Sequence, residues 1–214
     1  MRAVRTFIAG LAIMLSGSVL AANYDLPEDI PARKPGLWEM IETGTVGPNK
    51  VRSIKRYCLD GKADRALQEL EVMRKELSVV HNDVSCQPPQ IVLKGNVLTG
   101  DMACRTNSST DSAQAGQDFH WTMAFNSDTE VVLERQATPV DVMFLVDIDL
   151  VETQRWVGDC PTGQEPGDYI DEGFRYNSEA EPNEGRQDNI YESTRIVDKL
   201  LKEGKEINKR LGPM

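Results

Sequence analysis

The stretch Lys34-Pro35-Gly36-Leu37-Trp38-Glu39-Met40 marks the point where we expect the folded part of the chain to begin. The residues that follow, up to Val46, are rich in Ile, Thr and Val, which favours a β-strand. Turn-forming residues at 47–50 separate this strand from a second run, Val51 to Cys58. The two runs therefore predict a β-hairpin. The preceding residues, Asn23 to Arg33, show no periodic pattern and predict an extended arm.

A helix is expected over residues 62–77, directly after the second strand. Asp60 is suited to cap its first turn, because its side chain can accept a hydrogen bond from a free backbone N–H. Apolar residues then recur at helical spacing: Ala63, Ala66, Leu67, Leu70, Met73 and Leu77. This pattern indicates an amphipathic helix that packs on a sheet.

Further strands are expected downstream. Gly95-Asn96 lies between the apolar runs 91–93 and 97–98, which is typical of a tight hairpin. In the segment Phe119 to Phe125 every odd position is large and apolar, so one face of this strand should lie in the core. A strand over 130–137 and a long strand from Asp141 to Val157 follow; the long one should place Val142, Phe144, Val146, Ile148, Leu150 and Trp156 on one face.

The sequence thus predicts a mainly β protein: a curved antiparallel sheet or open barrel of about seven or eight strands, with one inserted helix and a C-terminal helical tail. We expect a signal peptide at 1–22, a disulfide-stapled β domain at 23–172, an acidic linker at 173–188 and an amphipathic helix at 189–214. Gly204 should weaken this last helix in its middle.

The N-terminal segment has the features of a secretory leader. Arg2 and Arg5 precede an apolar run, Phe7 to Leu15, and small residues around Ala21 and Ala22 suit cleavage. We expect export to the periplasm and a leader that is cleaved, because its apolar run is shorter than a bilayer requires. No transmembrane segment is expected after its removal, because no other segment is long and apolar enough.

Export determines how the four cysteines are interpreted. In an oxidising compartment they should form two disulfides. Cys86 and Cys104 lie at comparable distances on either side of the Gly95-Asn96 turn, so they can face each other across the hairpin. This pairing leaves Cys58 with Cys160. A zinc site is the alternative, but no Cys-x-x-Cys pair is present.

The charge balance excludes one class of partner. The chain has 34 Asp and Glu against 24 Lys and Arg, a net charge of −10. Binding to nucleic acid needs basic residues gathered on one face. We therefore expect no nucleic-acid partner.

Four sets of residues resemble a known bacterial family: Pro35-Gly36-Leu37-Trp38-Glu39, Arg56-Tyr57-Cys58-Leu59-Asp60, the pair Cys86 and Cys104, and the segment from Trp156 to Asp168. The family is known as domain of unknown function 3617, and the resemblance covers roughly Ala32 to Asp171. It implies an exported, mainly β protein of Gram-negative bacteria without a known activity. The chain departs from the family in a longer loop at 106–117 and in the tail after Glu172.

No catalytic motif, cofactor-binding motif or metal-ligand motif is recognisable in the sequence. His120 and His81 are each interpreted as structural or solvated residues. One group of carboxylates is a candidate calcium site, because Ca²⁺ prefers oxygen ligands, although their spacing matches no EF-hand loop. The group consists of Asp147, Asp149, Asp159, Glu165, Asp168, Asp171 and Glu172.

Three functions therefore stay open. The sequence favours a non-enzymatic protein that interacts with an envelope protein, with the C-terminal helix docking on a partner or on its own domain. The first alternative is a carrier of a small apolar ligand or lipid in a β cup lined by Trp38, Trp121 and Phe144. The second alternative is a calcium-binding acidic loop.

Overall fold

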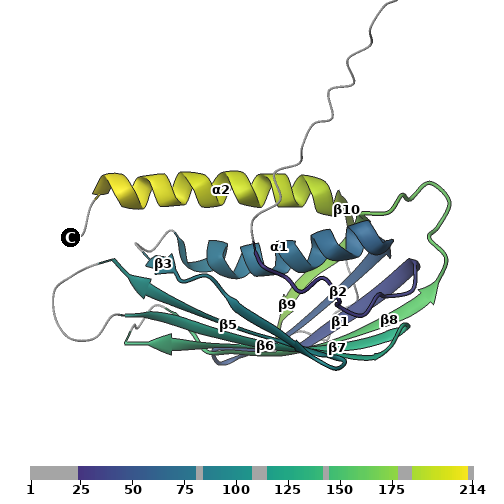
Figure 1. Cartoon of the computed structure of the whole chain (residues 1–214), viewed down its shortest axis with the longest axis horizontal. Helices are drawn as coiled ribbons and strands as arrows, with labels where there is room; N and C mark the ends of the chain where they lie inside the picture. Colours follow the sequence, from purple (N-terminus) through teal and green to yellow (C-terminus); the bar gives the residue numbers. More distant parts are fainter. Residues whose placement is uncertain (1–23, 81–83, 108–114, 142–144, 178–184, 212–214) are drawn as a thin grey trace, which may run out of the picture.

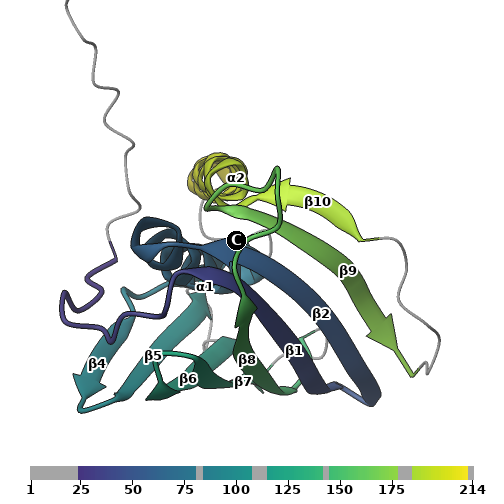
Figure 2. The ribbon, with the colours of Figure 1, turned by 90° about the vertical axis from the view of Figure 1, so that its right-hand side faces the viewer.

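The chain forms an open, curved antiparallel sheet with two helices stacked on its concave side (Figures 1 and 2). This is a computed structural model, and it describes residues 24–80, 84–107, 115–141, 145–177 and 185–211. The expected leader, His81, Val142 and Phe144 lie outside these ranges. The elements are β1 (Gly36–Val46), β2 (Asn49–Leu59), α1 (Gly61–Val80), β3 (Val84–Cys86), β4 (Gln90–Lys94), β5 (Val97–Thr106), β6 (Gly116–Ser127), β7 (Glu130–Val140), β8 (Ile148–Gly158), β9 (Asp168–Tyr176), β10 (Arg186–Asn189) and α2 (Ile190–Leu211).

The described strands follow the order β10-β9-β2-β1-β8-β7-β6-β5-β3, and β4 also pairs with β5. The sheet does not close, so the predicted class of a curved antiparallel sheet or open barrel is confirmed. The ten strands exceed the seven or eight expected. Two of the additional strands, β9 and β10, overlap the region expected to be an acidic linker. Residues 178–184 of that region lie outside the described chain.

The first and last of the segments that resemble the family, which begin at Pro35 and Trp156, lie side by side in the sheet. Leu37 of β1 is paired with Gly158 of β8. Gly36 has φ +135°, and an added Cβ would come within 2.4 Å of the Gly158 carbonyl oxygen. A glycine is therefore required at this position by both its backbone conformation and the close approach of β8.

Both helices begin as the sequence predicts. The Asp60 carboxylate accepts a hydrogen bond from the Ala63 N–H at 2.7 Å and caps α1. The Asn189 side-chain oxygen accepts one from the Tyr191 N–H at 2.9 Å and caps α2. Each cap satisfies a backbone donor that has no partner within its own helix.

The long strand predicted from Asp141 to Val157 is wrong in its first part. Asp141 has φ +51°, and β8 begins only at Ile148. Residues 145–147 are thus not part of a strand, although Leu145 and Val146 continue an apolar run that begins at Val142. From Ile148 onward the predicted faces are correct, since Leu150 is buried while Asp149 and Arg155 are exposed.

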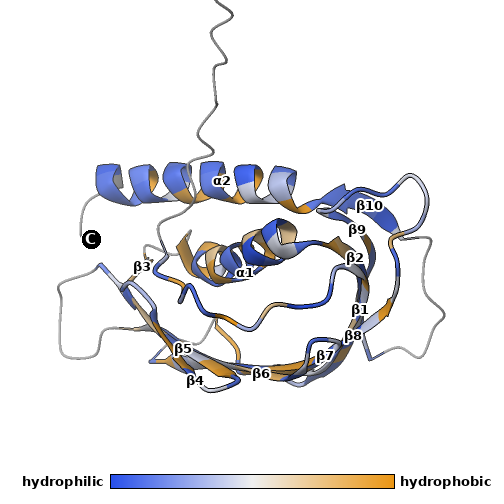
Figure 3. Ribbon diagram, turned by 45° about the vertical axis from the view of Figure 1, so that its right-hand side comes forward, coloured by the Kyte–Doolittle hydropathy of each residue, from blue (hydrophilic) through white to orange (hydrophobic). Residues whose placement is uncertain are grey.

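The C-terminal helix packs on its own domain. Ile190, Val197 and Leu201 are buried, and the side of α2 that carries them lies over α1 (Figure 3). The opposite side of α2 is hydrophilic (Figure 3). Gly204 is also buried, and α2 continues through it without interruption. Neither described helix combines the length and the apolar composition needed to cross a bilayer.

Candidate functional site

Apolar side chains fill much of the space between α1 and the concave face of the sheet. Trp38 is fully buried, and its Nε1 donates a hydrogen bond to the Lys34 carbonyl oxygen at 2.8 Å. Trp121 is also buried, with the Lys75 ammonium 4.7 Å from its ring centroid. Both tryptophans belong to one continuous core. The residues considered as cup lining are thus packed core residues, with Phe144 outside the described chain.

A layer of charged side chains lies beside the apolar core, between α1 and the sheet. Arg135 of β7 forms ion pairs with Glu42 of β1, with Glu71 of α1 at 3.0 Å and with Glu152 of β8 at 3.4 Å. One guanidinium group therefore connects three elements of the fold. Removing one partner of such a layer leaves a charge with little access to water, which is costly.

A second set of polar contacts continues from this layer toward the N-terminal arm. Arg33 Nε donates to the Asp64 carboxylate at 2.9 Å, and its guanidinium also donates to the Gln154 side-chain oxygen. The Gln154 amide in turn donates to Glu152 at 2.6 Å. The arm, α1 and β8 are thus joined by one hydrogen-bonded network.

Two titratable groups of the interior have pKa values that are shifted away from neutral pH. Burial by itself would raise the pKa of Glu71, but the nearby charges of Arg74, Lys75 and Lys55 bring its pKa below the ordinary value. Burial raises the pKa of Tyr57 to about 12. Glu71 is therefore ionised and Tyr57 neutral at neutral pH, whereas a general acid or base works best with a pKa near the working pH.

The interior also has little free space. A cavity of about 10 Å³ lies between Arg33, Gln68 and Glu152, which is room for roughly one water molecule. The chain on both sides of α1 is tethered, because Cys58 precedes the helix and Cys86 follows it. Cys58 lies at disulfide distance from Cys160, and Cys86 from Cys104. A ligand would have to displace packed and ion-paired side chains to enter here.

A larger hollow lies at the end of the helix pair, where α1, β3 and α2 meet. We call it the rim groove; its volume is about 420 Å³. It is lined by Glu76, Val80, Val84, Ser85, Cys86, Asn107, Lys205, Asn208 and Lys209. A neighbouring hollow of about 200 Å³ shares Glu76, Cys86 and Lys205 with it and continues over Pro88, Pro89 and Met102. The combined size is within the usual range of small-molecule sites.

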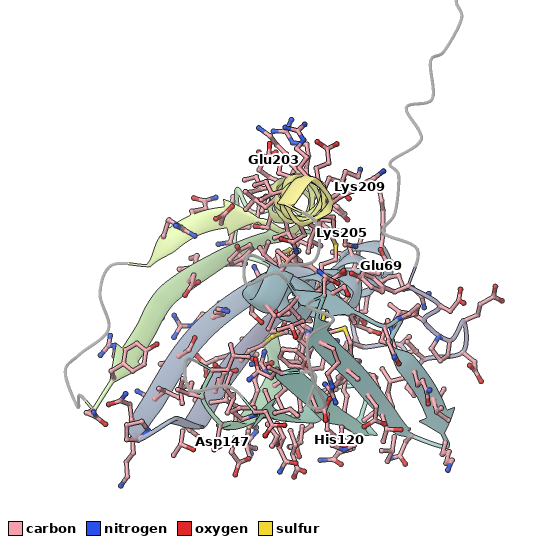
Figure 4. All side chains as sticks on the ribbon, turned by 90° about the vertical axis from the view of Figure 1, so that its left-hand side faces the viewer. Glu69, His120, Asp147, Glu203, Lys205 and Lys209 are labelled. Atoms are coloured by element: carbon pink, nitrogen blue, oxygen red, sulfur yellow. A yellow bond between two sulfur atoms is a disulfide. The ribbon has the colours of Figure 1, made fainter. Side chains whose placement is uncertain are left out.

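Specific contacts hold the walls of the rim groove together. The Lys205 ammonium lies 2.7 Å from one oxygen of Glu76, and the Tyr24 hydroxyl donates to the other at 2.7 Å. Asn208 Nδ2 donates to the Val80 carbonyl oxygen at 2.8 Å. Figure 4 shows Lys205 on the side of α2 that faces α1, Lys209 on the adjoining flank, and Glu203 projecting away. The groove is therefore a built feature of three packed elements.

Residues 33–160 match the model of the family described as protein of unknown function, DUF3617. The chain belongs to the DUF3617 family. No curated protein and no solved structure matched the chain.

The DUF3617 match ends at Cys160, before β9, β10 and α2. The rim groove accordingly has two origins. Glu76, Val80 and Val84 come from the part matched by the family, whereas Lys205 and Lys209 come from α2 beyond it. In this DUF3617 protein the added helix thus contributes the cationic wall of the groove.

His120 lies on the convex face of the sheet, far from both helices (Figure 4). Its Nδ1 is 2.7 Å from the Asp101 carboxylate, and its Nε2 is 3.3 Å from the Thr122 hydroxyl. This order of groups resembles a catalytic triad. However, His120 and Asp101 are solvent-exposed residues paired across β5 and β6, whose backbone N–H groups are used in the sheet. The arrangement is thus a contact between two exposed side chains on neighbouring strands.

The carboxylates considered for calcium do not converge. Asp147 and Asp149 are exposed, and Figure 4 shows Asp147 on the side away from the helices. Asp168 accepts a hydrogen bond from Asn189, and Glu172 forms an ion pair with Arg56. Over the described ranges, no group of three His, Cys, Asp or Glu side chains is placed to hold a metal ion.

Sequence reasoning missed the rim groove, because its residues come from distant parts of the chain. One signal was available: Lys205, Asn208 and Lys209 lie at the three- and four-residue spacing of a single helix face. Nothing in the sequence placed that face beside β3.

Proposed function

We propose that this protein is an exported, periplasmic binding protein that holds a small ligand in the rim groove and has no catalytic role. The observation that carries the proposal is the groove itself: a hollow of about 420 Å³ that combines the apolar residues Val80, Val84 and Cys86 with six polar or charged residues. Binding sites for small molecules combine an apolar lining with a small number of placed polar side chains.

Two further observations support a carrier at the rim over a carrier in the interior. The space beneath α1 is about 10 Å³, and the charged layer around Arg135 closes it. The rim groove, in contrast, can be filled without breaking the ion pairs of the core.

The two cysteine pairs at disulfide distance support the exported location, since disulfides persist in oxidising compartments.

The test uses the uncharged dye N-phenyl-1-naphthylamine, whose fluorescence rises in an apolar site. Protein purified from the periplasm of an expression host is titrated as wild type and as two variants. Ser85→Phe places a bulky side chain at an exposed position that lines the groove. Thr138→Phe adds the same group at an exposed position of β7 on the convex face.

We expect saturable binding that Ser85→Phe abolishes and Thr138→Phe leaves intact. No saturable binding, or equal binding by both variants, would contradict the proposal. Circular dichroism of each variant confirms that it is folded.

A further inference from the structure

We infer that the ligand of the rim groove is a small amphipathic anion, whose acidic group pairs with Lys209 and whose apolar part lies along Cys86, Pro88 and Pro89. This inference rests on the proposed function and assigns the chemical class of its ligand.

Among the described residues that line the groove, one positive charge has no ion-pair partner. Glu76 and Lys205 are 2.7 Å apart and neutralise each other. Lys209 has no ion-pair partner among the residues that the structure describes, although it lies on the same helix as several acidic residues. The nearest of these in sequence, Glu206, is paired with Arg210 at 3.6 Å. A bound anion would therefore gain an ion pair without breaking an existing one.

At the C-terminal end of α1, a hydrogen bond to a backbone carbonyl group reduces the repulsion that an anionic ligand would meet. The last carbonyl groups of a helix carry partial negative charge and repel anions. Here the Val80 carbonyl oxygen accepts a hydrogen bond from Asn208 Nδ2 at 2.8 Å. The same amide lies 3.4 Å from the Val84 carbonyl oxygen. Asn208 thus occupies the acceptors that would otherwise face the acidic group.

The shape of the groove supports an apolar extension of the ligand. The neighbouring hollow of about 200 Å³ shares Cys86 with the rim groove and continues past Pro88, Pro89 and Met102. Asp25, Glu76 and Lys205 also line this hollow, and Lys205 is paired with Glu76. Pro88 and Pro89 carry no charge and are accessible, so an extended apolar body that starts near Lys209 can continue along them. A purely polar anion would leave this surface unused, and a purely apolar ligand would leave Lys209 without a partner.

The experiment compares two dyes that differ in a single group. 1-Anilinonaphthalene-8-sulfonate is N-phenyl-1-naphthylamine with an added sulfonate, so the pair isolates the effect of the negative charge. Both are titrated into the wild type, Lys209→Glu and Lys199→Glu. Lys199 is on the same helix and is exposed, but it does not line the groove.

We expect the wild type to bind the sulfonate dye more tightly than the uncharged dye. Lys209→Glu should weaken sulfonate binding about fivefold, the factor that corresponds to one exposed ion pair, and leave binding of the uncharged dye unchanged. Lys199→Glu should change neither. The preference for the sulfonate should shrink at high salt, because exposed charges are screened.

The two proposals fail in different ways. If Ser85→Phe does not remove binding of either dye, the groove is not the site and the proposed function is wrong. If Ser85→Phe removes binding of both dyes but Lys209→Glu affects them equally, the groove is a binding site and the anionic class is wrong.

Discussion

Arg33 and Asp64 form a buried ion pair, with the guanidinium Nη2 2.5 Å from the carboxylate Oδ1 and both side chains less than a tenth exposed. The pair joins the arm before β1 to the first turn of α1. Arg33 also lies over Trp38, 5.4 Å from the ring centroid. The opening of the folded domain is thus fixed to the inserted helix by charge as well as by apolar packing.

Asp64→Ala should lower the free energy of unfolding by about 3 to 5 kcal/mol, because it leaves Arg33 buried without its carboxylate. Replacing both residues, as Arg33→Met with Asp64→Leu, should cost less than Asp64→Ala alone. Urea denaturation measures both. A double variant that is less stable than Asp64→Ala would show that the apolar pair does not fit and would contradict this account.

Glu71 should make stability depend on pH. Arg74, Lys75 and Lys55 lower its pKa in the folded state against the opposing effect of burial. A carboxylate with a lowered folded pKa stabilises the protein above its unfolded pKa of about 4.3, and this contribution is lost as the pH falls through the folded pKa. Between pH 7 and pH 3, the wild type should therefore lose more stability than Glu71→Gln. Urea denaturation across that range measures the difference, and parallel losses would exclude a role for Glu71.

The docking of α2 should depend on its inward residues only. Leu201 is buried, so Leu201→Ala should lower the free energy of unfolding by about 2 to 5 kcal/mol. Ile207 is 51% exposed, and Ile207→Ala should change stability by less than about 0.5 kcal/mol. Equal effects of the two substitutions in urea denaturation would mean that α2 does not pack on α1 as described.

The two cysteine pairs should differ in their effect on stability. Cys58 and Cys160 are 102 residues apart, whereas Cys86 and Cys104 are 18 apart. Closing a longer loop restricts the unfolded chain more, so replacing the first pair by serine should cost about 4 to 5 kcal/mol and the second about 3 kcal/mol. Thiol counting by mass spectrometry checks that the wild type contains both bonds. A larger loss from the shorter loop would contradict the argument.

Local patterns predicted the elements whose side chains alternate cleanly. In β6 the expected face of Phe119, Trp121, Met123 and Phe125 is buried. The Gly95-Asn96 turn joins β4 and β5, and it places Cys86 directly opposite Cys104. Asp60 and Asn189 mark helix starts that the structure contains. In each case the decisive contacts lie within a few residues or between two adjacent strands.

The prediction was wrong where a local pattern continued through a change of direction. Residues 142–146 are all apolar, as in a buried strand, yet Asp141 has a positive φ and β8 begins at Ile148. Conversely, Gly173 lies within β9, and the polar residues Arg186 to Asn189 form β10. The edge strand β10 buries little and needs no apolar pattern, so composition does not reveal it. β9 lies between β10 and β2, but the glycine within it interrupts its pattern.

The sequence by itself determined the class of the fold, the Asp60 cap of α1 and the inward face of β6, because these follow from local backbone chemistry and side-chain period. Only the tertiary structure decided that Glu42, Glu71 and Glu152 meet at Arg135, and that Lys205 and Lys209 line a groove with Val84. These groups are far apart along the chain, and no local interaction brings them together. Their positions follow from how the sheet curves and where α2 packs on α1, which is set by the burial of side chains from the whole domain.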